Sequence, residues 1–528
     1  MDPREHSRRH RGLVQVPGAI KTMENKKILS VTELAARVAA LRRRGKTVVL
    51  CHGVFDLMHP GHIKHLQAAK KEGDCLVVTL TPDKYVNKGP GRPVFNETLR
   101  AETLASLAAV DYVAINKWKT AVETIKTVKP SVYVKGSDYA APEEDLTGGI
   151  LREKAAIEAA GGRLHFTDEL TFSSTELLNK FFGVFSEETR EFLTNFRKKY
   201  SAADAIGALK ALRGLKVLVI GDTIIDEYHY CKGMDKPPKE NIISAKFVSE
   251  ERFAGGVLAC ANHLAGFCEK VDLVTCLGSR DSKEEYILEH LKPNVRPKFF
   301  YRDDACTVVK RRYVDPVFLT KLFEVSFLED RALPEGVAKR VCAHLAGGIA
   351  KYDLVLVSDF GHGFLNGKII DALQKAKFLA VNAQSNSANL GYNLVTKYGR
   401  ADYICVDEPE IRLAARDKYG ELNGLIKTMA ARLKSGRASI TRGHKGSVTY
   451  DAKGGFAECP VFSGKVVDRV GAGDAYLSLT APLAAAGRPM DLVGFVGNAV
   501  AAIKVGIVCN RSSIEPVELY KFIATLLK

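Results

Sequence analysis

The alternation of short apolar runs with helical patterns most constrains the fold, because it occurs in two series along the 528-residue chain. Runs such as 47–51 and 76–80 have the length of buried strands, and residues with helical spacing fill the stretches between them. Parallel strands need crossover connections, which are usually helices. The pattern therefore predicts two doubly wound α/β domains, the second of which begins with a strand at 216–221. Further strands are expected at 112–115, 132–134, 163–166, 354–358, 378–382 and 403–406, and helices at 31–44, 61–71, 96–108 and 120–126.

The domain organisation follows from where these two series start and stop. We expect a disordered basic tail over residues 1–29 and a first domain over 30–185. A charged helical linker is expected over 186–213 and a second domain over 214–528. Met23 stands just before the first regular segment, so an alternative interpretation places the natural start there.

Composition narrows the class of protein. The apolar share of 46% is typical of globular chains, and no apolar run reaches the roughly 18 residues that a membrane-spanning helix needs. The 11 cysteines include no CxxC pair, which disfavours disulfides and zinc and indicates a cytoplasmic location. The net charge of +16 comes from bases interleaved with acids, so we expect small anionic ligands rather than nucleic acid or a membrane.

A glycine turn with two histidines lies between the strand at 47–51 and the helix at 61–71. The first N–H groups of a helix suit a triphosphate, and Gly53 lets the backbone approach it. His59 and His62 are three residues apart, so both imidazoles can point at one anionic centre and stabilise charge on an attacked phosphate. The alternative interpretation is a pair of structural or surface histidines.

This stretch resembles the nucleotidyltransferase superfamily of the glycerol-phosphate cytidylyltransferase and heptose-phosphate adenylyltransferase type. The family pattern GxFDxxHxGH is matched at Gly53, Phe55, Asp56, His59, Gly61 and His62. The resemblance implies a Rossmann-like domain of the HxGH type in which His59 and His62 are catalytic. It also implies phosphate or nucleotide contacts from Gly53, Val54, Phe55, Lys88, Arg92, Lys135, Ser173, Ser174 and Thr175.

Simpler structural roles are open for part of this set. Solvated loop charges are the alternative for Lys88 and Arg92, although two cations in a glycine-rich loop beside the expected triphosphate modestly favour phosphate contact. Ser173–Thr175 also suits a plain helix N-cap, a role that is compatible with phosphate binding. By the family resemblance, the chemistry is in-line attack by a sugar phosphate oxygen on the α-phosphate of a nucleotide, with release of pyrophosphate. Mg²⁺ would be held mainly by phosphate oxygens and water, so we expect no dedicated carboxylate cluster for a metal.

A second glycine turn, Gly471–Asp474, opens a helix near the C-terminus. Successive N–H groups in such a turn form an anion hole for a transferring phosphoryl group. Asp474 is placed to accept the proton of an attacking hydroxyl. A GxGD turn alone is weak evidence for a catalytic site, because it is also compatible with a purely structural role.

The context of this turn resembles the ribokinase-like sugar kinases over roughly residues 215–528. The signature D-x-x-G-A-G-D is met by Asp468, Gly471, Ala472, Gly473 and Asp474. The resemblance implies that Asp474 is catalytic and that ATP or its phosphates contact Gly471, Ala472, Gly473, Asp407, Glu410, Thr441, Gly443 and Gly446. It further implies sugar contacts from Asp222, Asp226, Gly255 and Gly256.

Three departures from the kinase pattern lie on the sugar and phosphate side. The family's N-x-x-E appears as Asp407 to Glu410, where Glu410 can still contact Mg²⁺. The asparagine expected after Gly256 is Ala259, with Asn262 displaced, and the usual I-D-P-K segment reads Val381-Asn382-Ala383-Gln384. Sugar identity therefore does not carry over, although the complete anion-hole motif favours an active kinase.

Together the two halves are similar to the family of bifunctional heptose-phosphate kinases and heptose-1-phosphate adenylyltransferases that make ADP-heptose, with the domain order reversed. The leading hypothesis is a bifunctional enzyme that phosphorylates a heptose-like sugar phosphate and transfers a nucleotidyl group, from ATP by preference, to a sugar 1-phosphate. The alternative is a cytidylyltransferase that uses CTP and an alditol or sugar phosphate, with a divergent or regulatory kinase-like domain. Sugar phosphates and nucleotides are the expected partners, and a homodimer is the expected assembly.

Overall fold

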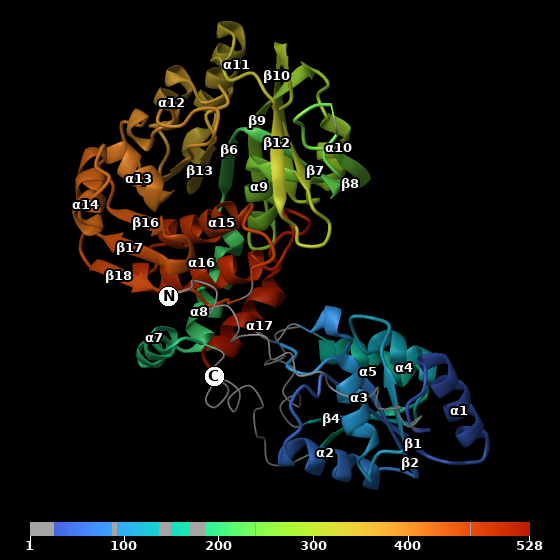
Figure 1. Ribbon diagram of the computed structural model, residues 1–528. Coiled ribbons are helices and arrows are strands. Elements are labelled where there is room, and N and C mark those ends of the chain that lie inside the picture. Colours follow the sequence, from blue (N-terminus) through green and yellow to red (C-terminus); the bar gives the residue numbers. More distant parts are fainter. Residues whose placement is uncertain (1–25, 87–91, 137–148, 168–184, 238, 465) are drawn as a thin grey trace, which may run out of the picture. The chain divides into compact units, whose positions relative to one another are not determined.

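The computed structural model describes residues 26–86, 92–136, 149–167, 185–237, 239–464 and 466–528. The chain divides into two compact units, which adjoin in the sequence at about residue 175. Both are α/β units in which helices cover a mainly parallel sheet (Figure 1). Each unit is described separately below.

The smaller unit contains a five-stranded parallel sheet in the order β3-β2-β1-β4-β5. Its strands are β1 (Val48–Gly53), β2 (Cys75–Leu80), β3 (Tyr112–Ile115), β4 (Val132–Gly136) and β5 (Arg163–Thr167). All five strands expected in this half are thus confirmed. The strand order reverses between β1 and β4, and open α/β sheets bind ligands at the carboxyl ends of strands at such a point.

Helices cover both faces of this sheet. They are α1 (Val31–Arg43), α2 (Pro60–Lys71), α3 (Glu97–Ala105), α4 (Val122–Val128) and α5 (Gly149–Ala159). Val49 of β1 belongs to a core with Leu66 of α2, whereas its neighbour Leu50 belongs to a second core with Leu34 of α1. Successive residues of a strand point to opposite faces, so burial on both faces explains the uninterrupted apolar run in the sequence.

The larger unit contains a nine-stranded sheet in the order β10-β9-β6-β13-β14-β15-β16-β17-β18. The pairs from β10 to β16 are parallel, and β17 and β18 add antiparallel strands at one edge. The parallel strands are β6 (Val217–Gly221), β9 (Val271–Arg280), β10 (Val295–Cys306), β13 (Leu354–Asp359), β14 (Leu379–Ala383), β15 (Tyr403–Asp407) and β16 (Arg437–Thr441), and the edge strands are β17 (Ser447–Asp451) and β18 (Gly455–Cys459).

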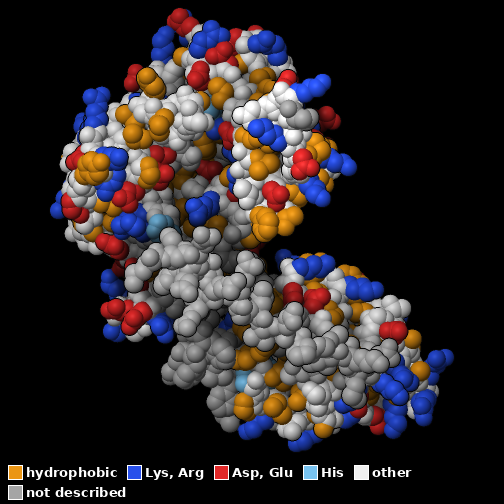
Figure 2. All heavy atoms as spheres, viewed as in Figure 1, with side chains coloured by type: hydrophobic (Ala, Val, Ile, Leu, Met, Phe, Trp, Pro, Cys, Tyr) orange, Lys and Arg blue, Asp and Glu red, His pale blue; other side chains and the backbone are white. Residues whose placement is uncertain are grey.

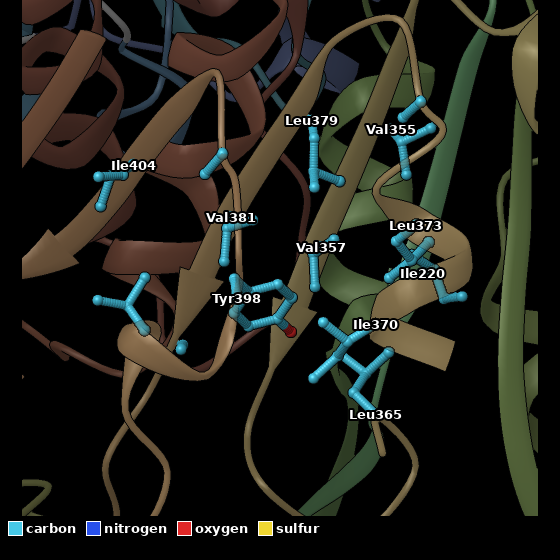
Figure 3. Packing of buried hydrophobic residues seen from close by; sticks show 14 of the residues in the cluster. Ile220, Val355, Val357, Leu365, Ile370, Leu373, Leu379, Val381, Tyr398 and Ile404 are labelled. Carbon is cyan, nitrogen blue, oxygen red and sulfur yellow. The ribbon is translucent and has the colours of Figure 1, made fainter. Parts of the chain in front are cut away.

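Two groups of helices cover the nine-stranded sheet. One face carries α11 (Glu335–Ala346), α12 (Gly367–Leu373), α13 (Glu408–Ala415) and α14 (Leu422–Arg432), and the other carries α9 (Val257–Ala265), α15 (Ala472–Ala485) and α16 (Met490–Lys504). Figure 3 shows Val357 of β13 near Ile370 of α12, and Val381 of β14 beside Tyr398, in the first of these cores. This core fixes the strand ends from which the site residues project.

A second, four-stranded sheet belongs to the larger unit and has the order β12-β11-β7-β8. It consists of β7 (Thr223–Gly233), β8 (Ala245–Gly256), β11 (Val309–Val314) and β12 (Lys321–Phe327). The sequence analysis did not predict this small sheet. Every residue of β12 and most of the first half of β8 are exposed, so neither strand has the alternating burial from which a strand is predicted.

The segment predicted as a helical linker folds onto the larger unit. Helices α7 (Glu187–Arg197) and α8 (Ala202–Lys210) occupy it, and the ring of Phe196 stacks on Phe495 of α16 at a centroid distance of 4.3 Å. Tyr200 Oη donates to Asp491 Oδ1 at 2.8 Å. Helix α17 (Pro516–Leu526) lies beside α8, and α10 (Glu284–His290) completes the unit. The domain limits given above stay a prediction.

The surface carries charges of both signs. Figure 2 shows basic and acidic side chains interleaved over the visible face of both units. Among the described residues, no helix combines the length and the apolar character needed to cross a bilayer.

Candidate active sites

The two histidines of the first motif lie together at the start of α2. His59 is the N-cap residue and Pro60 the first helical residue, a position that suits proline because no N–H is needed there. The ring centroids of His59 and His62 are 3.9 Å apart, and Phe55 contacts His62 edge to face at 5.5 Å. The structure therefore brings both imidazoles to one helix N-terminus at the carboxyl end of β1. Their catalytic role stays a prediction.

A buried arginine holds the turn that precedes these histidines. Arg100 of α3 is 1% exposed, and its guanidinium donates to the carbonyl oxygens of Val54, Thr81 and Phe95. The carboxylate of Asp56 accepts the N–H of Phe95 at 3.2 Å. Arg100 thus joins the end of β1, the end of β2 and the segment that leads into α3. The sequence analysis did not foresee this scaffold role of Arg100.

Replacing Arg100 with methionine should destabilise the smaller unit, because one buried and two partly buried carbonyl groups, together with the carboxylate of Asp83, lose their donor. At about 1 kcal/mol or more for each unsatisfied group, we expect the free energy of unfolding to fall by about 3 kcal/mol. The only tryptophan, Trp118, belongs to this unit, so urea unfolding of the full chain followed by its fluorescence measures the change. Arg163→Met, at a half-exposed ion pair with Glu72, is the control and should cost less than about 1 kcal/mol. Equal midpoints for the two variants would contradict the assignment.

Lys135 lies at the carboxyl end of β4, beside β1. Its ammonium is 3.1 Å from Glu153 Oε2, and both side chains are largely buried. Burial, together with the charge of Lys135, lowers the pKa of His52 to about 3 and that of His65 to about 4. These two histidines are therefore neutral near pH 7, and each bonds a threonine, His52 to Thr79 and His65 to Thr167.

Of the other residues predicted to contact phosphate in this unit, some lie at the turn after β1, and others lie outside the described residues. Gly53 ends β1, and Val54 and Phe55 form the turn, where Phe55 has a positive φ of 48°. Arg92 is half-buried before α3. Lys88, Ser173, Ser174 and Thr175 lie outside the described residues.

In the larger unit, the loop before α15 is held by buried charges. Gly471 is the N-cap residue with φ +79°, and a Cβ there would lie 2.3 Å from Asn510 Oδ1, so glycine is required. Lys504 Nζ donates to the carbonyl of Val470 at 2.9 Å. Asp468 accepts Tyr228 Oη at 2.7 Å, which links the loop to the small sheet. These contacts fix a turn whose following N–H groups, in the first turn of α15, lack intrahelical acceptors.

Asp474 lies in that first turn, next to Ala472 and Gly473, and is 6% exposed. Its Oδ1 accepts a hydrogen bond from Gln384 Nε2 at 3.3 Å. Burial raises the pKa of Asp474 to about 7, and the nearby carboxylate of Asp226 acts in the same direction. A carboxyl group with a pKa near neutrality is matched to general base catalysis.

This shift predicts a pH dependence of the kinase reaction. The carboxyl group of Asp474 is protonated below about pH 7 and cannot then accept a proton, so kcat for sugar-dependent ADP formation should rise with pH and level off above about pH 8. The measurement is kcat at saturating substrates between about pH 5.5 and 9, with protein integrity checked at each pH. A kcat that is independent of pH over this range would contradict a base with a raised pKa.

The nucleotide-side residues lie at neighbouring strand ends. Asp407 caps α13 in a reciprocal arrangement with Glu410, in which each carboxylate accepts the other's N–H at 2.8 Å or less. Burial and the charge of Asp407 raise the pKa of Glu410 to about 8. Thr441 pairs with Asp407 across β15 and β16, and the short turn from Gly443 to Gly446 follows β16. The structure therefore places the five predicted nucleotide-side residues Asp407, Glu410, Thr441, Gly443 and Gly446 at or just beyond the carboxyl ends of β15 and β16.

The predicted sugar contacts also come together. A Cβ on Gly255 would lie 2.1 Å from Asp226 Oδ2, and one on Gly256 would lie 2.6 Å from the carbonyl of Asp222. These two glycines therefore let β8 approach both aspartates. Asp222 Oδ2 accepts the N–H of Phe360 at 2.8 Å, and burial raises the pKa of Asp222 to about 6. Figure 2 shows the larger unit hollowed between the lobe of α12 to α14 and the lobe of β7 and β8.

Two of the departures from the kinase pattern now have structural explanations. Gln384 stands where the family has lysine, and its amide holds Asp474. Asn262 does not take the place of the expected asparagine, because it donates to the carbonyl of His290 and accepts the N–H of Lys292. Ala259 is buried in α9.

Sequence reasoning missed the cations that surround the aspartates. Lys310 and Arg312 of β11 lie opposite Asp226 and Tyr228 of β7, and Arg312 pairs with Asp226. A usable signal was present, because residues two apart on a strand share a face. It was overlooked because β11 had not been predicted as a strand. Among the described residues, no group of three or more metal-binding side chains is arranged around a metal position.

Comparison with known proteins agrees with this division. Residues 50–180 match the family described as cytidylyltransferase-like, and residues 215–515 match the pfkB family of carbohydrate kinases. The bifunctional protein HldE of Bradyrhizobium sp. is 44% identical over 165 residues, which cover 31% of this chain and 32% of that protein. HldE of Geobacter metallireducens is 40% identical over 168 residues, again 31% and 32% of the two chains. The matched region thus spans about a third of the length of these relatives.

Two solved structures are similar to part of the chain. Phosphofructokinase-2 from Escherichia coli in complex with fructose-6-phosphate is 13% identical, with a TM-score of 0.49 and coverage of 60% of this chain and 100% of that one. Ribokinase from Thermotoga maritima is 18% identical, with a TM-score of 0.45 and coverage of 58% and 99%.

The two folds and their glycine turns define a chain in which a Rossmann-like nucleotidyltransferase domain precedes a ribokinase-like sugar kinase domain. More than half of the chain matches one family model, and the chain belongs to the pfkB family of carbohydrate kinases. The predicted pairing of these two domain types, in this order, is confirmed.

Proposed function

We propose that this chain makes a nucleotide-activated sugar in two reactions, one in each domain. The larger domain phosphorylates a heptose-like sugar phosphate with ATP, and the smaller domain transfers a nucleotidyl group, from ATP by preference, to the resulting sugar 1-phosphate. The supporting observation is that each domain opens a helix with a glycine turn at strand carboxyl ends and presents suitable side chains there, His59 with His62 and Asp474. The similarity of the first domain to HldE proteins supports the pairing of activities.

In the kinase reaction, Asp474 accepts the proton of the attacking sugar hydroxyl. The hydroxyl oxygen forms a bond to the γ-phosphorus of ATP, and the bond from that phosphorus to the β–γ bridging oxygen breaks, so that ADP leaves. The N–H groups of Gly473 and Asp474 stabilise charge on the transferring group. The partly buried carboxylates Asp407 and Glu410 fit a divalent cation, because their closely placed negative charges favour one, and Mg²⁺ bound with the nucleotide would neutralise phosphate charge.

In the nucleotidyl transfer, a phosphate oxygen of the sugar 1-phosphate attacks the α-phosphorus of the nucleotide and pyrophosphate leaves. The imidazoles of His59 and His62 donate hydrogen bonds to the α-phosphate as negative charge develops there. The positive end of α2 adds to this stabilisation. No covalent intermediate on the protein is needed.

A substrate screen with the full chain tests the proposal. Four nucleoside triphosphates are combined with a panel of sugars, sugar phosphates, alditol phosphates and sugar 1-phosphates, and ADP and pyrophosphate are measured separately. We expect ADP with a sugar phosphate and pyrophosphate only with a sugar 1-phosphate. The absence of turnover with every member of the panel would overturn the proposal.

The same screen separates the alternatives. Pyrophosphate release with CTP and an alditol phosphate would favour a cytidylyltransferase. Binding of sugar without ADP formation would favour a regulatory kinase-like domain. Small anionic substrates remain the proposed partners, and the homodimer and the cytoplasmic location stay predictions.

A further inference from the structure

Lys310 is a buried cation in the small sheet. The residue is 8% exposed and stands opposite Asp226 in the pairing of β11 with β7. With the residues that the structure describes, its ammonium forms no ion pair within 4.0 Å and no hydrogen bond, and it lies 5.9 Å from the ring centroid of Phe360. The side chain of Lys310 is thus largely withdrawn from water while its ammonium has no close acceptor among the described residues, so the position is one where a bound ligand would supply the missing acceptors.

His362 is a second buried group without a partner. The residue is 3% exposed, and neither ring nitrogen has a hydrogen-bond partner among the described residues. It stands between Gly361 and Gly363, both of which have positive φ, so the loop after β13 turns this imidazole inward. The ring lines a cavity together with Asp222 and Thr223 at the start of β7.

The two side chains share one neighbourhood beside the predicted sugar contacts. Phe360, over which Lys310 lies, is parallel to His362 at a centroid distance of 6.5 Å. Burial and, after it, the charge of Lys310 lower the pKa of His362, and the charge of Asp222 acts in turn on Lys310. The nearby acids do not pair with Lys310, because Asp226 and Glu324 both pair with Arg312.

We propose that Lys310 and His362 form the subsite for the phosphate group that the sugar carries before it is phosphorylated again. Both side chains donate hydrogen bonds, and both lack acceptors, which a phosphate monoester supplies. Asp222 beside them accepts the N–H of Phe360 and is suited to sugar hydroxyls rather than to an anion. The inference rests on the proposed kinase function. It adds that Lys310 and His362 select a phosphorylated sugar over the free sugar.

The test compares matched pairs of substrates in ADP formation by the full chain: mannose with mannose 6-phosphate, fructose with fructose 6-phosphate and sedoheptulose with its 7-phosphate. The wild type should turn over a phosphorylated member only. Lys310→Met should then raise the KM for that phosphorylated sugar at least about tenfold, because a tenfold change corresponds to the loss of one charge-assisted hydrogen bond. The change in kcat should be smaller. Arg311→Met removes the next cation of the same strand, which faces the other way and pairs with Glu227, and should leave KM unchanged.

The outcomes distinguish a failure of the proposed kinase function from a failure of the proposed phosphate subsite. If no sugar of either kind supports ADP formation, the proposed kinase function itself fails. If free sugars serve as well as their phosphates, or if Lys310→Met leaves the KM of the phosphorylated sugar unchanged, the kinase stands and the subsite is wrong. Loss of folding is checked by thermal unfolding, in which Lys310→Met should melt no lower than the wild type because it removes a buried charge. His362→Gln, which keeps a donor, should raise KM less than His362→Ala.

Discussion

Asp474→Asn should reduce sugar-dependent ADP formation by about 10²–10⁴-fold, the usual contribution of a general base. Asparagine keeps the size of the side chain and its contact with Gln384, but it cannot accept the proton of the attacking hydroxyl. The loss should appear in kcat rather than in KM, because the carboxylate acts on the proton that moves during the reaction. Pyrophosphate release by the other domain should be unchanged, since Asp474 belongs to the larger unit alone.

A matched control keeps this experiment specific. Asp371→Asn makes the same change at an exposed position of α12 in the same unit and should leave kcat as in the wild type. If Asp474→Asn retains more than about a tenth of the wild-type kcat, a general-base role for Asp474 is wrong.

His62→Ala should reduce pyrophosphate release by about 10²–10³-fold, as expected for removal of one donor to a charged transition state. The imidazole of His62 lies at the start of α2 beside His59, so both act on the same phosphate in the proposed reaction. Sugar-dependent ADP formation should continue at the wild-type rate. Asp474→Asn and His62→Ala would then separate the two activities, because each variant would lose the activity of one domain and keep that of the other.

The control for His62 is another histidine of the smaller unit. His165 on β5 is half-buried near Glu72, and His165→Ala should leave pyrophosphate release unchanged. An equal loss in His165→Ala and His62→Ala would show that the smaller unit is merely destabilised, and the proposed role of His62 would then be abandoned.

The sequence predicted the parts of the fold in which local pattern and burial agree. Central parallel strands such as β2 and β13 are buried on both faces, so their apolar runs are continuous, and their neighbours are helices with clear spacing. The small sheet could not be predicted in this way. Strand β12 is exposed along its whole length, and β8 is exposed over most of its first half, so the apolar residues of both strands follow no rule that a single sequence reveals.

The sites were predictable where a short motif carries all of its members, as in Gly471–Asp474, but not where the residues come from distant segments. The contact of Gln384 with Asp474 joins the end of β14 to the start of α15, 90 residues later. Likewise, Arg100 reaches the turn after β1 from a helix 46 residues further along the chain. Such partners depend on strand order, which a single sequence does not give.

The docking of α7 against α16 determines where the kinase half can be separated from the rest. The aromatic rings of Phe196, Phe462 and Phe495 meet in one cluster, and Arg197 binds the carbonyl of Leu526 near the C-terminus. A fragment cut at residue 214 would uncover this cluster to water and become prone to aggregate. A fragment cut ahead of Ser186 would keep the rings covered. The segment 186–213, which was predicted as a linker, is therefore a structural part of the kinase domain that stabilises it at its N-terminal side.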